Sequence, residues 1–237
     1  MMPIKLKEDY FTQFDQALRT ITDEYEILNL IAIERPNGQS GYWERLARLS
    51  FFNKLYDQYR YHFLYEIQGL SSQIHFGIAN SILFRDQIST VRGKPNLYNH
   101  RYTFMIESTI HGIYAYWNRV GLALNTYLKK PINIKRTYFS AVVKQLLIDY
   151  PDLNDNKFYQ WLNSVNDALN DLERNEFAHN NSLIMQNFLP KNSEEMNFDE
   201  LLKMPDLLLS HNKAIVDDIY NLVELIELLE VSANHNQ

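Results

Sequence analysis

The chain contains no cysteine among its 237 residues. Disulfide bonds, zinc sites built on thiolates and thiol nucleophiles are therefore excluded, and the absence suits a reducing compartment. Glycine and proline are also scarce, at seven each, which disfavours an all-β fold with many tight turns. No uninterrupted apolar run approaches the length of a membrane span, and residues 1–9 contain no apolar core of a secretory signal. We therefore expect a cytoplasmic protein with no membrane partner.

The charge balance is acidic, with 23 Lys and Arg against 29 Asp and Glu and a formal net charge of −6. This argues against binding to duplex nucleic acid over a broad surface, because that binding scales with the number of phosphates neutralised. A small, local phosphate-binding site remains compatible with it. Apolar residues make up 46% of the chain and aromatic residues 14%, enough for a large core without disulfides or metals.

Most of the chain carries apolar residues at alternating spacings of three and four, the pattern of amphipathic helices. We expect helices over residues 8–32, 42–68, 97–128, 138–150, 155–172 and 210–231, whereas 70–90 is ambiguous. The region 187–210 contains Pro190 and Pro205 and is interpreted as a partly ordered loop with a turn of helix near Asp199–Lys203. The sequence thus predicts an all-α, antiparallel helical bundle of about five to seven helices, forming a single domain over residues 1–237.

A line of polar residues runs along the longest of these helices. Glu107, His111, Tyr114 and Asn118 follow one another at spacings of four, three and four, so all four point the same way. We refer to them as the polar line. Because the line borders the apolar stripe, its side chains either bond neighbouring groups at a helix edge or face a cleft. Both interpretations stay open at this stage.

A basic stretch follows that helix: Lys129-Lys-Pro-Ile-Asn-Ile-Lys-Arg136. Lys129 and Lys130 are expected to complement the dipole at the helix C-terminus, which the proline ends. Together with Lys135 and Arg136 they are also candidates for contact with an RNA backbone.

The segment richest in chemistry is Asp171-Leu-Glu-Arg-Asn-Glu-Phe-Ala-His179. It places Arg174, Asn175 and His179 at the end of an amphipathic helix, before a polar break at Asn180. An Arg followed by a His after four to six intervening residues is expected about once by chance in a chain of this composition. The inference that this segment is a functional motif therefore rests on the adjacent Asn and on the position at the end of a helix.

In this segment the sequence resembles the HEPN superfamily of helical bundle proteins (higher eukaryotes and prokaryotes nucleotide-binding domain). The hallmark of that family is an Arg, often followed by a polar residue such as Asn, and a His four to six residues later. Arg174, Asn175 and His179 fit it, and the match covers about residues 155–181.

The resemblance implies a HEPN-like fold and a metal-independent endoribonuclease that acts on RNA as a homodimer, often as a toxin or phage-defence effector. It implies no cofactor and no metal, and an antitoxin or regulatory protein as a further partner. His179 would be the catalytic acid or base, Arg174 the phosphate-binding cation and Asn175 an orienting partner. Some family toxins carry a Tyr two residues after the His that a partner enzyme modifies. Asn181 stands there in this chain, which puts that route of control in doubt.

These side chains suit the chemistry of RNA cleavage. The 2′-hydroxyl of RNA is itself the nucleophile, so the protein has to supply a proton acceptor and stabilise a charged phosphorus. Imidazole titrates near neutral pH, and guanidinium stays charged and forks onto two phosphate oxygens. Glu107 and His111 are auxiliary candidates that could orient His179 or assist proton transfer.

Alternatives without catalysis are also open. Arg174 can form a helix-end ion pair with Glu173 or Glu176, and His179 can cap free carbonyl groups. A second hypothesis is a non-catalytic dimer that binds RNA, a nucleotide or a partner protein. A third is an assembly protein that uses its aromatic stripes as an interface.

Overall fold

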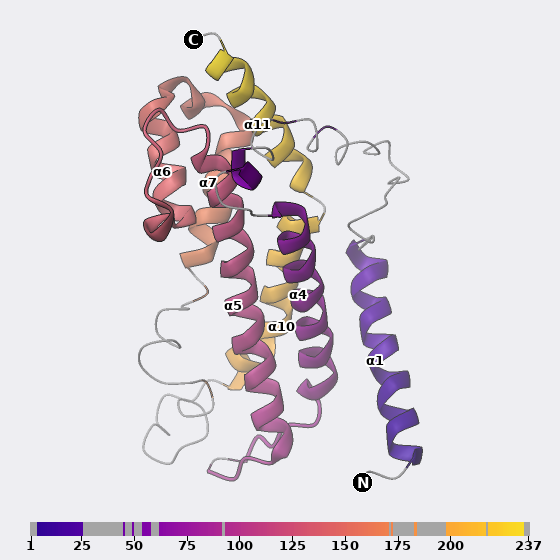
Figure 1. Ribbon diagram of the computed structural model, residues 1–237. Helices are drawn as coiled ribbons and strands as arrows, with labels where there is room; N and C mark the ends of the chain where they lie inside the picture. The colour runs from indigo at the N-terminus through magenta and orange to yellow at the C-terminus, as the bar shows by residue number, and fades with distance from the viewer. Residues whose placement is uncertain are drawn as a thin grey trace. The chain divides into compact units, whose positions relative to one another are not determined.

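The chain folds entirely into helices and connections. The computed structural model describes residues 4–25, 45, 49, 54–57, 62–91, 93–170, 172, 183, 198–216 and 218–234. Its elements, in order, are α1 (Ile4–Tyr25), α4 (Phe63–Arg85), α5 (Leu97–Asn125), η1 (Ile134–Arg136), α6 (Phe139–Asp149), η2 (Pro151–Asp155), α7 (Lys157–Asn170), α10 (Phe198–Val216) and α11 (Ile219–Asn234). Over these ranges there is no strand, and the predicted all-α class is confirmed (Figure 1).

The helices belong to two compact units. The first unit comprises Met1–Ile27, Ser72–Ile113 and Leu172–Lys213, and the second comprises Leu28–Ser71, Tyr114–Asp171 and Ala214–Gln237. Helices α4, α5 and α10 contribute residues to both units, so the division does not follow the order of the sequence. The single domain expected over residues 1–237 stays a prediction. None of the helices described here is long and apolar enough to cross a membrane.

In the first unit, α4 and α5 run antiparallel and touch closely at a glycine (Figure 1). A Cβ added to Gly77 would lie only 1.9 Å from Oγ1 of Thr109, so a larger residue fits only if the Thr109 side chain shifts. The Thr109 hydroxyl is in turn held by a 2.7 Å hydrogen bond to the carbonyl of Met105. Residues 70–90, whose sequence was ambiguous, are helical as far as Arg85. Gly77 lies within this helix at the point of close contact with α5.

The segment 198–210, expected to be a loop, is instead the first part of α10, with Pro205 inside the helix. A proline has no N–H, so the carbonyl of Leu201, four residues earlier, loses its helical partner. The Tyr102 hydroxyl on α5 donates to that carbonyl at 2.5 Å, and Tyr102 is completely buried. A tertiary hydrogen bond thus replaces the one that the proline removes. The loop prediction is wrong here, and residues 187–197 lie outside the described part.

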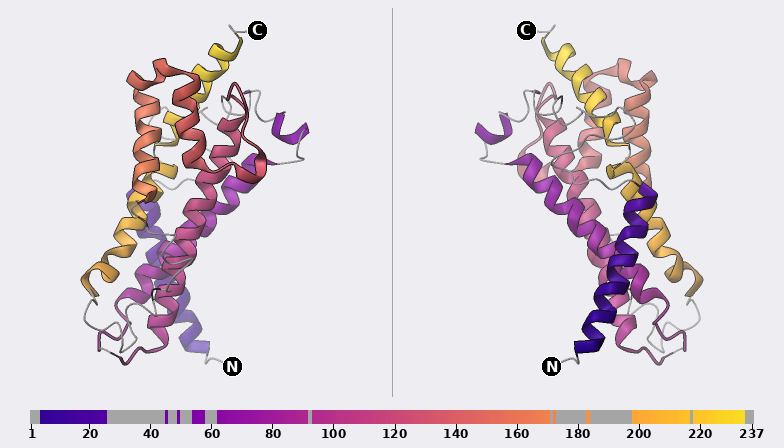
Figure 2. Two further views of the ribbon diagram at one scale, coloured as in Figure 1. Left: turned by 90° about the vertical axis from the view of Figure 1, so that its left-hand side faces the viewer. Right: turned by 90° about the vertical axis from the view of Figure 1, so that its right-hand side faces the viewer.

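The second unit packs α6 and α7 against the second half of α5 (Figure 2). Its core centres on Trp117, which is fully buried and lies 5.2 Å from the Phe139 ring and 6.0 Å from the Trp161 ring between centroids. Tyr138 is the N-cap residue of α6, but its side chain makes no capping hydrogen bond. The missing acceptor comes from Asn118 on α5, whose Oδ1 accepts the N–H of Phe139 at 3.0 Å.

Two of the predicted helices are interrupted in the structure. The helix expected over 42–68 is interrupted, because His62 is not helical and α4 begins at Phe63. The final helix is not continuous from 210 to 231, because residues to Val216 belong to α10 and α11 begins at Ile219. In the first helix, α1 ends at Tyr25, and residues 26–32 lie outside the described part. The spacing of apolar residues predicts which face of a helix is buried, but it does not predict where a helix is interrupted.

The Tyr102 hydroxyl gives a first test. We expect Tyr102→Phe to lower the free energy of unfolding by about 1–3 kcal/mol, because the buried Leu201 carbonyl loses its donor. Pro205→Ala supplies an N–H to the same carbonyl, so in that background the cost of Tyr102→Phe falls below about 1 kcal/mol. Urea unfolding of the four proteins measures this coupling. Equal costs in both backgrounds would contradict it, and exposed Tyr138→Phe serves as the control, with an expected change within about 0.5 kcal/mol.

Candidate functional site

The predicted catalytic residues Arg174, Asn175 and His179 lie outside the described residues, so their relative geometry stays a prediction. The structure describes the two residues that flank them. Leu172 is 1% exposed and Leu183 is 5% exposed, and both belong to the first unit. The chain is therefore anchored in that unit's core on either side of the motif.

Glu107 of the polar line makes one of these anchors. Its Oε1 accepts the backbone N–H of Leu183 at 2.6 Å. A carboxylate that accepts a main-chain N–H forms a strong, charge-assisted bond. Glu107 thus fixes the chain four residues after His179. His111 lies one turn along α5 on the same face as Glu107, and its side chain is exposed.

The other two members of the polar line bond main-chain groups in the second unit. The Tyr114 hydroxyl donates to the carbonyl of Leu169 in the last turn of α7. Asn118 accepts from the N–H of Phe139 at the start of α6. For Glu107, Tyr114 and Asn118, the interpretation as a hydrogen-bonded helix edge is therefore correct. Only His111 presents an exposed titratable group.

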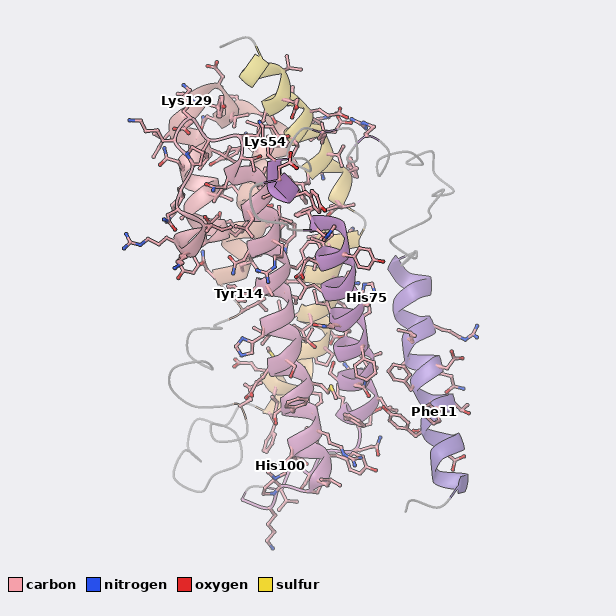
Figure 3. All side chains as sticks on the ribbon, viewed as in Figure 1. Phe11, Lys54, His75, His100, Tyr114 and Lys129 are labelled. Atoms are coloured by element: carbon pink, nitrogen blue, oxygen red, sulfur yellow. The ribbon has the colours of Figure 1, made fainter. Side chains whose placement is uncertain are left out.

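The four basic residues proposed for RNA contact are exposed and lie in the second unit. Lys129 places its Nζ 5.5 Å from the centroid of the Tyr150 ring (Figure 3), while Lys130 follows it and Lys135 and Arg136 stand in η1. The helix-dipole role expected of Lys129 and Lys130 is wrong, because α5 ends at Asn125 and has no basic residue in its last turn. They remain cations that face solvent.

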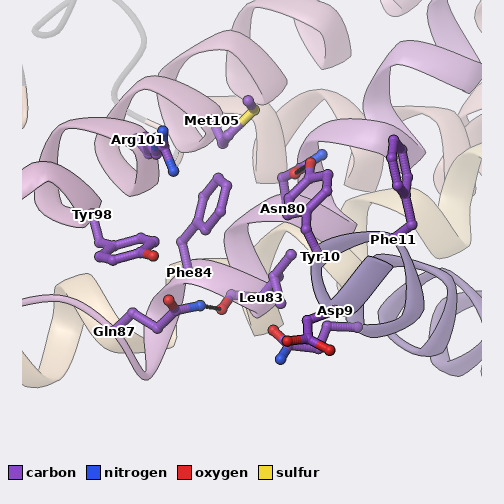
Figure 4. A pocket seen from close by; sticks show the side chains of 11 residues that line it. Asp9, Tyr10, Phe11, Asn80, Leu83, Phe84, Gln87, Tyr98, Arg101 and Met105 are labelled. Atoms are coloured by element: carbon purple, nitrogen blue, oxygen red, sulfur yellow. Dashed lines mark hydrogen bonds between the residues drawn. The ribbon is translucent and has the colours of Figure 1, made fainter. Parts of the chain in front are cut away.

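A pocket that the sequence did not reveal lies in the first unit, between α1, α4 and α5 (Figure 4). Its volume is about 590 Å³, within the usual range of about 300–1,000 Å³ for small-molecule sites. We call it the aromatic pocket. Its lining includes four aromatic side chains and one guanidinium: Tyr10, Phe11, Phe84, Tyr98 and Arg101.

Sequence spacing could have indicated part of this pocket. Phe84 closes α4 and Tyr98 opens α5, so an antiparallel hairpin of the two helices brings the rings together, 6.0 Å apart between centroids. The contribution of Phe11 could not be read in the same way. It belongs to the apolar stripe of the first helix, yet its side chain is 63% exposed.

A second polar feature of the first unit is buried. His75 on α4 (Figure 3) is 9% exposed, and Asn212 on α10 is completely buried. Among the described residues, Nε2 of His75 and both amide atoms of Asn212 have no hydrogen-bond partner of good geometry. Burial lowers the pKa of His75 from its ordinary value of 6.5 to about 4, and the neighbouring Asn212 amide offsets this in part. The imidazole is therefore neutral at pH 7.

The pKa of His75 predicts a pH dependence of stability. Between pH 6.5 and 4 the unfolded chain takes up a proton on His75 and the folded chain does not, so stability falls as the pH falls. From pH 7.5 to 5.0 we expect wild type to lose about 2 kcal/mol more than His75→Gln. Urea unfolding of both proteins at the two pH values measures this difference. An equal loss in both would show that His75 makes no contribution.

Neither a metal site nor a relative identifies the chain. The described residues contain no group of three or more His, Cys, Asp or Glu side chains that could hold a metal ion. Comparison of the chain with protein-family models, with curated proteins and with solved structures finds no match.

Proposed function

We propose that the chain is a metal-independent endoribonuclease of the HEPN type that acts as a homodimer. The observation that carries the proposal is the sequence Arg174-Asn175-Glu176-Phe177-Ala178-His179 at the end of an amphipathic helix. The all-α fold is compatible with it. The setting we propose is cytoplasmic, as a toxin or phage-defence effector under the control of an antitoxin or regulatory protein.

The proposed reaction needs only side chains that the motif contains. His179 takes the proton from the 2′-hydroxyl while water protonates the leaving 5′-oxygen, or it protonates the 5′-oxygen while water takes the 2′-proton. Such proton transfer by a side chain contributes about 10²–10⁴-fold to rate. Arg174 binds two oxygens of the phosphate as negative charge accumulates on it. Asn175 orients the phosphate or the imidazole. The 2′-oxygen bonds to phosphorus as the 5′-oxygen departs, leaving a 2′,3′-cyclic phosphate and a 5′-hydroxyl.

Anchoring of the flanking residues supports this role for the segment. Catalytic groups have to be held within a fraction of an ångström of the reacting atoms, and rigid neighbours supply that order. Leu172 and Leu183 are buried on either side of the motif, and Glu107 binds the backbone at Leu183. The exposed His111 stands on the face of α5 that carries Glu107, so we retain it as an auxiliary proton-transfer candidate.

Helix geometry leaves two ways to complete the site: the helix ends or deforms between Arg174 and His179, or two facing motifs combine across a two-fold axis. Five residues along an ideal helix correspond to a rotation of roughly 140° after full turns are removed. Arg174 and His179 on one undistorted helix would therefore not reach the same phosphate. A two-fold axis near the motif would let Arg174 of one subunit and His179 of the other meet at one phosphate. The exposed cations Lys129, Lys130, Lys135 and Arg136 are proposed contacts for the RNA backbone outside that site.

The first test incubates RNA with the protein in EDTA. We expect wild type to cleave, with a 2′,3′-cyclic phosphate and a 5′-hydroxyl at the new ends. Arg174→Ala and His179→Ala each lose about 100-fold or more, because one removes the phosphate-binding cation and the other the proton-transfer group. The rate of cleavage on denaturing gels gives the measurement, and circular dichroism checks folding.

Matched controls separate chemistry from loss of a charge. Arg19→Ala and His100→Ala remove the same residue types from exposed positions on α1 and α5 and should leave the rate unchanged. His111→Ala reports on the auxiliary role, which an unchanged rate would exclude. Undiminished cleavage by Arg174→Ala or His179→Ala would refute the proposal. RNA binding without cleavage in wild type would instead support the non-catalytic module.

A second test addresses the composite site. Arg174→Ala and His179→Ala proteins are inactive alone, but a mixed dimer would contain one intact site if each site draws its Arg and His from different subunits. After mixing and subunit exchange we expect up to about a quarter of wild-type activity, because half the dimers are mixed and each has one of its two sites intact. Activity of the mixture that stays at the level of the separate variants would show that each subunit uses its own pair.

A further inference from the structure

We propose that the aromatic pocket binds a small aromatic carboxylate, that is, a planar ring with one carboxylate group. The pocket belongs to the first unit and is lined by residues from α1, from α4 with the residues that follow it, and from α5 (Figure 4). The proposal is independent of the nuclease motif, because it uses none of that motif's residues.

The walls of the pocket suit a flat ring. Phe84 and Tyr98 stand 6.0 Å apart with their planes inclined by 48°. Tyr10 and Phe11 on α1 lie 5.6 Å apart in an edge-to-face arrangement. Figure 4 shows the two pairs at different ends of the pocket. Rings at these positions offer both faces and edges, and contacts of this kind are favourable at centroid distances of about 4.5–7 Å.

Arg101 supplies the positive charge. Its guanidinium carbon lies 5.5 Å from the centroid of Tyr98 and 5.9 Å from that of Phe84, within the range of a cation–π contact with both rings. No carboxylate in the described part of the chain forms an ion pair with Arg101. A guanidinium held on aromatic rings is set to bind a carboxylate through two parallel hydrogen bonds.

The charge of the pocket favours one negative charge over two. Arg101 is the one cation among the described lining residues, and Asp9 on α1 adds a carboxylate to the same lining. A phosphate monoester carries about −1.5 to −2 at pH 7 and would leave charge unbalanced beside Asp9. A carboxylate carries only −1, so it places less negative charge beside Asp9 while still pairing with the single guanidinium.

Two of the three amides of the lining are already bonded to the protein. Asn80 accepts the Tyr10 hydroxyl at 2.9 Å and donates to the Phe76 carbonyl at 2.8 Å. Gln87 donates its Nε2 to the Leu83 carbonyl at 2.9 Å, whereas the third amide, Gln13, is exposed on α1. A nucleobase is recognised by hydrogen bonds to its polar edges. A simple aromatic ring needs no such bonds, so it suits this lining better than a nucleotide.

The test is calorimetric titration of the full chain with four compounds at pH 7. 2-Naphthoate has the ring and the charge, 2-naphthamide has the ring alone, cyclohexanecarboxylate has the charge alone, and adenosine monophosphate carries a base and a phosphate. We expect one site for 2-naphthoate. Each of the other three should bind at least about tenfold more weakly, because each lacks one feature that the pocket recognises.

Two variants assign the binding to this pocket. Arg101→Gln should weaken the binding of 2-naphthoate by about ten- to a hundredfold and leave the affinity for 2-naphthamide unchanged, because only the charged contact is lost. Phe11→Ala should weaken the binding of both compounds, because both contact the ring of Phe11. The matched controls are Arg19→Gln on the surface of α1 and Phe104→Ala on α5. Phe104 is 62% exposed against 63% for Phe11 but does not line the pocket.

Each outcome decides the proposal. Binding of 2-naphthoate that depends on Arg101 and Phe11, and not on their controls, supports it. No binding of 2-naphthoate, or equal binding in Arg101→Gln, overturns it. Adenosine monophosphate binding more tightly than 2-naphthoate also overturns it, in favour of a nucleotide site. Failure here leaves RNA cleavage in EDTA untouched, and loss of cleavage leaves this titration untouched, so the two proposals fail separately.

Discussion

The structure depends on one helix whose polar side chains complete the hydrogen bonding of other segments' backbones. Along α5, Tyr102 donates to the carbonyl that Pro205 leaves free, and Glu107 accepts the N–H of Leu183. Further along, Tyr114 and Asn118 do the same for the end of α7 and the start of α6. Main-chain groups buried without partners are costly, and helix ends and breaks are where they occur. By meeting these needs in both units, α5 fixes where other helices begin, end and tolerate a proline.

This arrangement bears directly on the proposed nuclease motif. The segment with Arg174 and His179 follows α7, whose last turn is bonded by Tyr114, and it precedes Leu183, which is bonded by Glu107. The residues that hold the flanks therefore come from the same face of α5 that carries the exposed His111. Glu107 is also a proposed auxiliary residue for orienting His179 or assisting proton transfer. Its bond to the backbone N–H of Leu183 engages only Oε1, so the anchoring role and the auxiliary role are compatible.

The first unit also carries two features of different chemistry that the nuclease proposal does not use. The aromatic pocket combines four aromatic rings with a guanidinium free of ion pairs among the described residues, and one of the rings, Phe11, is exposed. The pair of His75 and Asn212 is closed to solvent and keeps the imidazole neutral. Burial separates their roles. An accessible cation on aromatic rings recognises an anion, whereas a buried imidazole without a counter-charge makes stability depend on pH.

The sequence by itself determined the fold class, because three-four spacing of apolar residues depends only on the period of the helix. It is also the source of the proposal that Arg174, Asn175 and His179 form a nuclease motif. Tertiary structure decided what pattern cannot express. Pro205 indicated a loop, but the Tyr102 hydroxyl donates the hydrogen bond that the proline cannot make. Gly77 indicated a weak helix, but Thr109 fills the space that a side chain at this position would occupy. Phe11 matched a buried stripe but lies in a pocket wall. In each case the outcome depends on a side chain from another helix. The spacing of residues within one helix carries no information about which side chains pack against it.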